Sequence, residues 1–236
     1  MKVPYSLDVD YNACKHEGAR SFCQLIPAAL RDFAAIKFTV IYPKGAILFL
    51  EGQEARGVFV LCQGEVKLSI SSREGKKLII RIVQTGEILG LIAALAGSPY
   101  EATAEAIYPC ETAFVRRDDF LRLITKYPEA SQIVAKQISS QYQATYEQLR
   151  TVGLSASVHK KLARLLLSWS GGMEETRDGA MIRLSLTHEE LAEFIGTTRE
   201  TVTRTLSEFR HRHLVELHGS TLTIPSRAAL ETFVGA

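Results

Sequence analysis

The stretch that decides the C-terminal fold is LTHEELAEFIGTTRETVTRTLSEFRHR, residues 186–212. Thr187 and Glu190 have the spacing of a capping box, in which a hydroxyl and a carboxylate satisfy free amides at a helix start. Gly196 interrupts the helical pattern with the residue type that adopts a positive φ without strain. The stretch therefore predicts two short helices joined by a tight turn.

The second helix of this pair has one apolar and one polar face. Thr197 or Thr198 can cap it at its start. Val202, Leu206 and Phe209 then fall at i, i+4 and i+7, so they share a buried face. The side chains left on the opposite face are Arg199, Glu200, Thr203, Arg204 and Ser207.

This polar face has the chemistry of a DNA reader. An arginine can donate two hydrogen bonds to O6 and N7 of guanine, and a glutamate can accept one from N4 of cytosine. At the N-terminal end of a second helix, such residues lie where helix-turn-helix proteins contact base edges. The alternative is a solvated helix with ordinary surface charge. The predicted base-reading residues are Arg199, Glu200, Thr203 and Arg204, and the predicted phosphate contacts are Thr187, Thr198, Thr201, Ser207 and His218.

The charge balance limits how such a protein can bind DNA. The chain has 236 residues, enough for two domains, and a formal net charge of only +2. From residue 155 to the end, ten Lys/Arg balance ten Asp/Glu, but residues 199–213 hold four arginines and two histidines against two glutamates. We therefore expect weak non-specific binding, with specific contacts carrying more of the affinity.

Several functional classes are disfavoured by the residue patterns. The apolar runs at 91–96 and 162–169 are far shorter than a bilayer span, and no apolar core follows Lys2, so neither a membrane protein nor a secreted one is expected. Four irregularly spaced cysteines favour a reducing, cytoplasmic location over a disulfide framework. We find no nucleophile–base motif, H-x-x-x-H metal spacing or phosphate-cradling glycine loop, so no catalytic residues are expected.

Residues 36–115 have the sequence pattern of an all-β domain. Short β-branched runs alternate with glycine turns at spacings typical of a sandwich or barrel. A hairpin loop is predicted at 71–75, and a short helix, PAALRDF (27–33), precedes the sheet. The predicted strands are FTVIY (38–42), AILFL (46–50), GVFVL (57–61), VKLSI (66–70), KLIIRIV (77–83) and TAFV (112–115).

After Asp118 the helical period replaces the alternating one. A short helix is expected up to Lys126, and Pro128 opens a long one to about Gly153. Steps of three and four along the long helix predict a coiled-coil seam that pairs with a second copy of the chain. The alternative is a helix that packs only on its own β-domain. The predicted seam residues are Ile138, Tyr142, Thr145, Leu149 and Val152, flanked by Gln137, Gln141, Gln143 and Gln148.

The last part of the chain completes a DNA-binding domain. Residues 153–155 (GLS) are a candidate hinge, residues 158–169 an amphipathic helix and residues 171–180 a loop. Two short strands around His218 form a predicted wing whose imidazole and amides are candidates for phosphate contact; a surface turn without contacts is the alternative. The predicted organisation is an N-terminal segment (1–24), a β-domain that senses a signal (25–127), a dimerisation helix (128–153) and a DNA-binding domain (154–236).

Two motifs together resemble one protein family. PKGAILFLEGQEARGVFVLCQGEVKL (43–68) is similar to the cyclic-nucleotide-binding β-roll, and it is joined to RETVTR (199–204) in a winged helix-turn-helix. From about residue 25 to 230, the chain resembles the CRP/FNR family of bacterial transcription regulators. The resemblance implies an α+β fold with an N-terminal double-stranded β-helix (jelly-roll-like) sensor domain, a long dimerisation helix and a C-terminal winged helix-turn-helix.

The resemblance also implies partners. A homodimer would bind a palindromic site on double-stranded DNA, and RNA polymerase is a candidate further partner. By position, Arg199, Glu200 and Arg204 match the base-reading residues of the catabolite activator, whereas Thr203 stands where the oxygen-responsive branch has a serine. A TGTGA-like half-site is expected first and a TTGAT-like one second.

The effector cassette GEILGLIAALAGSPYEATAEA (86–106) departs from the cyclic-AMP-binding pattern. Leu91 stands where members that bind cyclic AMP have a glutamate for the ribose, and Glu101 or Tyr100 stands near their phosphate-binding arginine. A carboxylate there would repel the cyclic phosphate, so we expect no cyclic AMP binding of the usual kind. A less polar effector, or apolar side chains that only fill the barrel, are the alternatives. The candidate effector pocket comprises Gly86, Glu87, Gly90, Leu91, Ile92, Tyr100, Glu101 and Thr103.

Iron–sulfur, haem and redox sensing are further alternatives. Cys14 and Cys23 keep the outer spacing of the family's N-terminal cysteine trio, but Glu17 replaces the middle cysteine and Cys110 is three residues out of register with the internal ligand. All six histidines lie outside the β-domain, so an internal haem ligand is absent. A reversible disulfide between the two N-terminal cysteines is a further alternative, and no tightly bound cofactor is expected. A cyclic-nucleotide-sensing module that does not bind DNA would lack the 199–204 motif.

Overall fold

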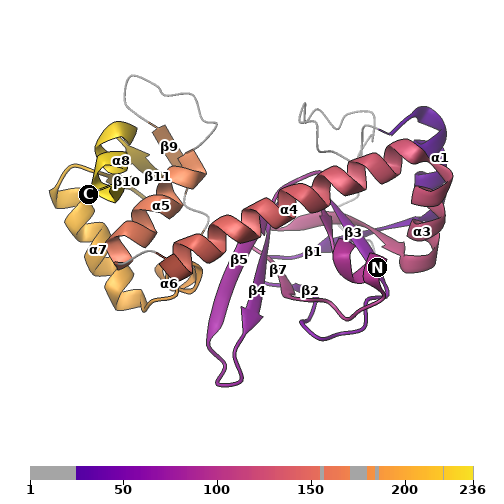
Figure 1. Cartoon of the computed structure of the whole chain (residues 1–236), viewed down its shortest axis with the longest axis horizontal. Helices are drawn as coiled ribbons and strands as arrows, with labels where there is room; N and C mark the ends of the chain where they lie inside the picture. Colours follow the sequence, from indigo (N-terminus) through magenta and orange to yellow (C-terminus); the bar gives the residue numbers. More distant parts are fainter. Residues whose placement is uncertain (1–24, 155–156, 171–179, 184–185, 220, 236) are drawn as a thin grey trace, which may run out of the picture. The chain divides into compact units, whose positions relative to one another are not determined.

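The computed structural model describes residues 25–154, 157–170, 180–183, 186–219 and 221–235 (Figure 1). The chain divides into two compact units. The first comprises the residues up to Leu68 and those from Ile82 to Gln141, and the second comprises Ser69–Arg81 and the residues from Tyr142 onward. The predicted β-domain therefore supplies most of the first unit, and the predicted DNA-binding domain most of the second.

Two four-stranded sheets form the β-domain, with strand orders β1-β8-β3-β6 and β2-β7-β4-β5. Along the chain the strands alternate between the sheets except at the β4–β5 hairpin, which lies within one sheet, and this is the jelly-roll-like arrangement that the sequence predicts. In the first sheet, β1 and β3 both pair antiparallel with β8. The strands are β1 (Lys37–Tyr42), β2 (Ile47–Phe49), β3 (Gly57–Gln63), β4 (Val66–Ser71), β5 (Lys77–Val83), β6 (Ile88–Leu89), β7 (Thr103–Ala106) and β8 (Cys110–Arg116).

The loop between β4 and β5 is the predicted hairpin loop, and the two strands run side by side in Figure 1. The backbone N–H of Ser72 donates to the carbonyl of Lys76 over 2.9 Å. Gly75 closes the turn with a φ of 81°, a backbone conformation that residues other than glycine rarely adopt. The turn chemistry therefore fixes the register of the hairpin.

Strand β3 is buried on both faces because its alternate side chains enter two different cores. Phe59 and Leu61 pack with residues from both sheets, so this core lies between the sheets. Val58 and Val60 pack on the opposite side, in a core shared with four helices. These helices are α1 (Pro27–Ile36), α2 (Leu91–Ala96), α3 (Arg117–Lys126) and the N-terminal part of α4 (Pro128–Leu154).

The second unit contains the helix pair and the wing. Its three-stranded sheet has the order β10-β11-β9, and β11 pairs antiparallel with both neighbours. Leu162, Leu191, Phe209 and Leu222 are fully buried in this unit. Its elements are α5 (Val158–Ser170), β9 (Ala180–Arg183), α6 (His188–Ile195), α7 (Arg199–His211), β10 (Glu216–His218), β11 (Thr221–Ile224) and α8 (Arg227–Gly235).

Several elements are absent from the sequence prediction. Strands β6, β7 and β9 have two to four residues, too few for an alternating pattern to stand out. Helix α2 (Leu91–Ala96) is a six-residue turn between Gly90 and Gly97, both left-handed. Helix α8 was also not predicted. Of the hinge predicted at residues 153–155, the first two belong to α4, because a helix tolerates glycine at a cost of about 1 kcal/mol, and the third lies outside the described residues.

The glutamines along α4 correct a second prediction. We interpreted them as the polar border of a dimer seam, but Gln137 is only 2% exposed and binds the chain's own backbone. Its Nε2 donates to the carbonyl of Gly86 over 3.0 Å, and its Oε1 accepts from the N–H of Ile88 over 2.9 Å. Gln141 Nε2 also donates to the carbonyl of Ile88, over 3.1 Å. These amides tether α4 to the 86–88 turn.

Gln148 behaves in the same way within the second unit. Its Nε2 donates to the carbonyl oxygens of Ile79, over 2.9 Å, and of Phe194, over 2.6 Å. One buried amide thus joins the hairpin strand β5, helix α4 and the end of α6. Of the four glutamines named from the sequence, Gln143 is the exposed one.

Candidate nucleic-acid interface

Helix α6 begins with the predicted capping box. The backbone N–H of Glu190 donates to Thr187 Oγ1 over 3.2 Å, and the Thr187 N–H donates to Glu190 Oε2 over 2.8 Å. The helix ends at Ile195, where Gly196 adopts a φ of 68°. Both the start and the turn that follows are therefore confirmed.

Thr198, and not Thr197, caps α7. Its hydroxyl oxygen accepts from the N–H of Thr201 over 3.4 Å, whereas the Thr197 N–H donates to the carbonyl of Ala192 and belongs to the turn. The predicted apolar face is buried, and Thr205 shares it. The buried residues of α7 are Val202, Thr205, Leu206 and Phe209.

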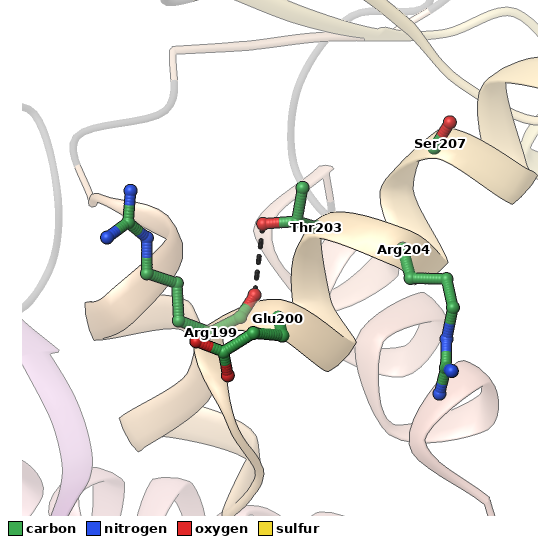
Figure 2. Close-up of a pocket in the computed structure, with 5 residues that line it drawn as sticks. All are labelled: Arg199, Glu200, Thr203, Arg204 and Ser207. Atoms are coloured by element: carbon green, nitrogen blue, oxygen red, sulfur yellow. Dashed lines mark hydrogen bonds between the residues drawn. The ribbon is translucent and has the colours of Figure 1, made fainter.

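The opposite face of α7 is open to solvent. Its polar side chains line a hollow of about 490 Å³, shown in Figure 2. The guanidinium groups of Arg199 and Arg204 diverge to either side, with the Glu200 carboxylate near Arg199 (Figure 2). The structure thus brings together on one helix face every residue that the sequence assigned to base reading, together with Ser207: Arg199, Glu200, Thr203, Arg204 and Ser207.

Glu200 is held in its ionised form. Its own backbone N–H and the Thr198 hydroxyl donate to the carboxylate, and the charge of Arg199 adds to them, so the pKa of Glu200 lies below its usual value. A carboxylate near neutral pH accepts hydrogen bonds only, which is what contact with the amino group of cytosine requires.

His188, the first residue of α6, contacts this face and is not among the site residues predicted from the sequence. Its Nδ1 lies 2.9 Å from Thr203 Oγ1, and the same hydroxyl lies 3.0 Å from the carbonyl of Arg199. Its hydrogen bond with Thr203 required the three-dimensional structure.

The predicted phosphate contacts divide by environment. Thr187 and Thr198 are exposed at the two helix starts, where backbone amides favour anions. Thr201 and Ser207 are half-buried on α7, and the Thr201 hydroxyl lies 3.0 Å from that of Thr198. His218 is exposed at the end of β10, with Nε2 3.8 Å from a carboxylate oxygen of Glu216. The strands of the predicted wing are confirmed; its contact with phosphate stays a prediction.

The candidate effector residues lie mostly in packed positions. Leu91 is 1% exposed in the core beside the helices, whereas Ile92 and Glu101 point to solvent. Gly86 accepts from Gln137, and Thr103 Oγ1 accepts from the N–H of Glu51 over 3.1 Å. The other members are Glu87, which is half-buried, and Gly90, where the Cβ atom of any other residue would collide with the Tyr100 ring.

Aromatic rings occupy the interior between the two sheets. Tyr100 is 3% exposed, donates its hydroxyl to the carbonyl of Gly57 over 2.8 Å and stacks on Phe49 with centroids 3.9 Å apart. Phe59 continues the cluster at 5.6 Å from Phe49 and 4.9 Å from Phe114. Burial raises the pKa of Tyr100, so its hydroxyl stays protonated at neutral pH.

The predicted seam is divided between the two units. In the first, Ile138 packs against the chain's own core. In the second, Tyr142 and Leu149 are 67% and 65% exposed, Thr145 is exposed and Val152 is half-buried. Large apolar side chains that face water in this way are typical of an interaction surface.

The two cysteines that the structure describes pack into hydrophobic cores. Cys14 and Cys23 lie outside the described residues. Cys62 packs with the helical core, whereas Cys110 belongs to the core between the sheets, and burial raises the pKa of the Cys110 thiol.

Among the described residues, no three His, Cys, Asp or Glu side chains gather as a metal site would need, and no helix is long and apolar enough to cross a membrane.

Comparison with known proteins identifies both halves of the chain. Residues 39–127 match the model of the cyclic nucleotide-binding domain, and residues 160–233 match the Crp-like helix-turn-helix domain. The global nitrogen regulator of Synechococcus elongatus is 26% identical over 191 residues, which cover 80% of this chain and 86% of that protein. The CRP-like cAMP-activated global transcriptional regulator of Mycobacterium tuberculosis is 24% identical over 200 residues, covering 84% and 88%.

Among solved structures, FixK2 from Bradyrhizobium japonicum has the same fold. The TM-score is 0.74 at 18% sequence identity, and the match covers 85% of this chain and 98% of that one. The fold class predicted from the sequence is therefore confirmed.

Proposed function

This chain belongs to the CRP/FNR family of transcription regulators, and we propose that it acts as a homodimer that binds a palindromic DNA site through α7. The observation that carries the proposal is the face of α7 in Figure 2, where two arginines and an ionised glutamate stand exposed on a helix fixed by caps and a buried opposite face. Such a face needs no further ordering of its backbone before it can enter a major groove. We propose no catalytic role.

Each base-reading residue has a role that follows from its chemistry. Arg199 and Arg204 would each donate two hydrogen bonds to a guanine, and Glu200 would accept from cytosine. These roles support a TGTGA-like half-site, with a TTGAT-like one as the second choice. Thr187, Thr198, Thr201, Ser207 and His218 would fix the register on the phosphate backbone.

The dimer would form along the C-terminal part of α4. Tyr142 and Leu149 expose apolar surface there, and pairing with a second copy would remove it from water. A two-fold axis along this helix matches a palindrome whose half-sites lie about 34 Å apart. The domain boundaries that we adopt are those predicted from the sequence: 1–24, 25–127, 128–153 and 154–236.

We also propose that the β-domain does not bind cyclic AMP in the manner of the relatives named for it. Leu91 contributes to the core and Glu101 carries a charge that repels phosphate, and the Tyr100 ring occupies space between the sheets. Allosteric control would then reach α7 from another event in the β-domain or N-terminal segment. Isothermal titration calorimetry is expected to show no submicromolar cyclic AMP binding, and such binding would refute this part.

Site selection from random 30-base-pair duplexes tests the DNA-binding function. Wild-type protein should enrich an inverted repeat, whereas a variant with Arg199→Ala and Arg204→Ala should enrich none. Enrichment of a single, unrepeated half-site would contradict the dimer but not DNA reading. Failure of wild-type protein to enrich any sequence, in the apo state and with cell extract metabolites added, would refute the function.

A further inference from the structure

The Thr203 hydroxyl has no hydrogen left to donate to a base, and its orientation is fixed by two hydrogen bonds. A threonine hydroxyl has a single hydrogen. That hydrogen is donated to the carbonyl of Arg199, one helical turn earlier, over 3.0 Å, an arrangement that threonines in helices favour. The oxygen therefore accepts from His188 Nδ1 at 2.9 Å, which requires His188 to carry a proton on that nitrogen.

The consequence is a fixed rotamer with an exposed methyl group. Figure 2 shows the Thr203 hydroxyl turned back to the Arg199 carbonyl, while the methyl carbon projects away from the helix. Thr203 is exposed and shares its face with the two arginines and Glu200. An apolar group thus stands among the charged groups of the reading face.

We infer that Thr203 selects a thymine in each half-site by contact between its methyl group and the C5-methyl group of the base, with His188 as the residue that positions it. Of the base edges in the major groove, thymine alone offers a methyl group, and a threonine methyl is one of its known partners. A free hydroxyl would instead accept or donate at several bases and discriminate poorly. This inference rests on the proposed DNA-binding function.

Deoxyuridine provides the test, because it lacks only the C5-methyl group of thymidine. We would replace each thymine of the selected duplex in turn, symmetrically in both half-sites, and measure affinity by fluorescence anisotropy. At one position, wild-type protein should lose about fourfold in affinity per half-site, the change expected for one buried methyl group. The ratio between thymine and uracil duplexes is taken within each protein, so an inactive fraction cancels.

Three variants separate the methyl from the hydroxyl. Thr203→Val keeps a methyl group and loses the hydroxyl, so it should still discriminate thymine from uracil. Thr203→Ser loses the methyl group and should bind both duplexes equally. His188→Ala leaves the hydroxyl held by the Arg199 carbonyl alone, so it should lower the ratio without abolishing binding.

Two results would overturn the inference while leaving DNA binding intact. One is a wild-type protein that binds every uracil duplex as well as the thymine duplex. The other is a Thr203→Val variant without discrimination, which would assign the reading to the hydroxyl. Absence of specific binding to any duplex would instead refute the proposed function itself.

Discussion

Gln137 offers a direct test of how α4 is attached to the β-domain. Gln137→Leu preserves approximate volume but removes the bonds to the Gly86 carbonyl, at 3.0 Å, and to the Ile88 N–H, at 2.9 Å. Each buried backbone group left without its partner costs about 1–3 kcal/mol, and the leucine side chain recovers part of that. The free energy of unfolding should therefore fall by about 2–4 kcal/mol.

Urea denaturation followed by far-ultraviolet circular dichroism measures this change, with Gln143→Leu as the matched control. Gln143 lies on the same helix but is exposed, so its substitution should alter stability by less than about 0.5 kcal/mol. Hydrogen exchange of the Ile88 amide should also accelerate in the Gln137 variant alone. Equal unfolding midpoints for the two variants would refute the reasoning that these amides anchor the helix.

Three further predictions concern the other sites. Arg204→Ala should weaken binding by about 1–3 kcal/mol at a single G·C pair and relax specificity there, and an equal loss on every sequence in anisotropy titrations would identify a phosphate contact instead. Leu149→Lys, at a side chain that is 65% exposed, should halve the mass in light scattering, whereas Glu147→Lys should not; an unchanged mass for the leucine variant would contradict the seam. Burial raises the pKa of the Cys110 thiol, so its thiolate is scarce at pH 8, and iodoacetamide should label it at least about tenfold faster in urea than in the folded protein; equal rates by mass spectrometry would show that it is accessible.

The helix-turn-helix was predictable because its determinants are local. The capping box at Thr187, the left-handed Gly196 and the apolar spacing of α7 each lie within a few residues of the feature they specify. The long strands of the β-domain were predictable for the same reason. A strand of two to four residues, such as β6, forms only because a neighbouring strand supplies its hydrogen bonds. No local sequence pattern therefore predicts it.

The side-chain roles that depend on residues distant in the chain could not be predicted from the sequence. Spacing places Gln137 and Gln148 beside a seam, but both amides bind backbone carbonyls far away in the chain. Spacing likewise places Thr203 on the reading face without showing that His188 engages its hydroxyl. Periodicity identifies which face of a helix a residue occupies, and only the tertiary structure identifies its partner.

The most direct measurement of the central claim is competition at fixed salt. Wild-type protein would be bound to a fluorescent TGTGA-N6-TCACA duplex, and unlabelled duplexes of the same base composition, one palindromic and one scrambled, would be added in turn. If the exposed face of α7 reads bases, the palindrome should displace the probe at concentrations at least about tenfold below the scrambled duplex. Equal displacement by both duplexes would show that Arg199 and Arg204 contact only the phosphate backbone, and the claim of sequence reading would be wrong.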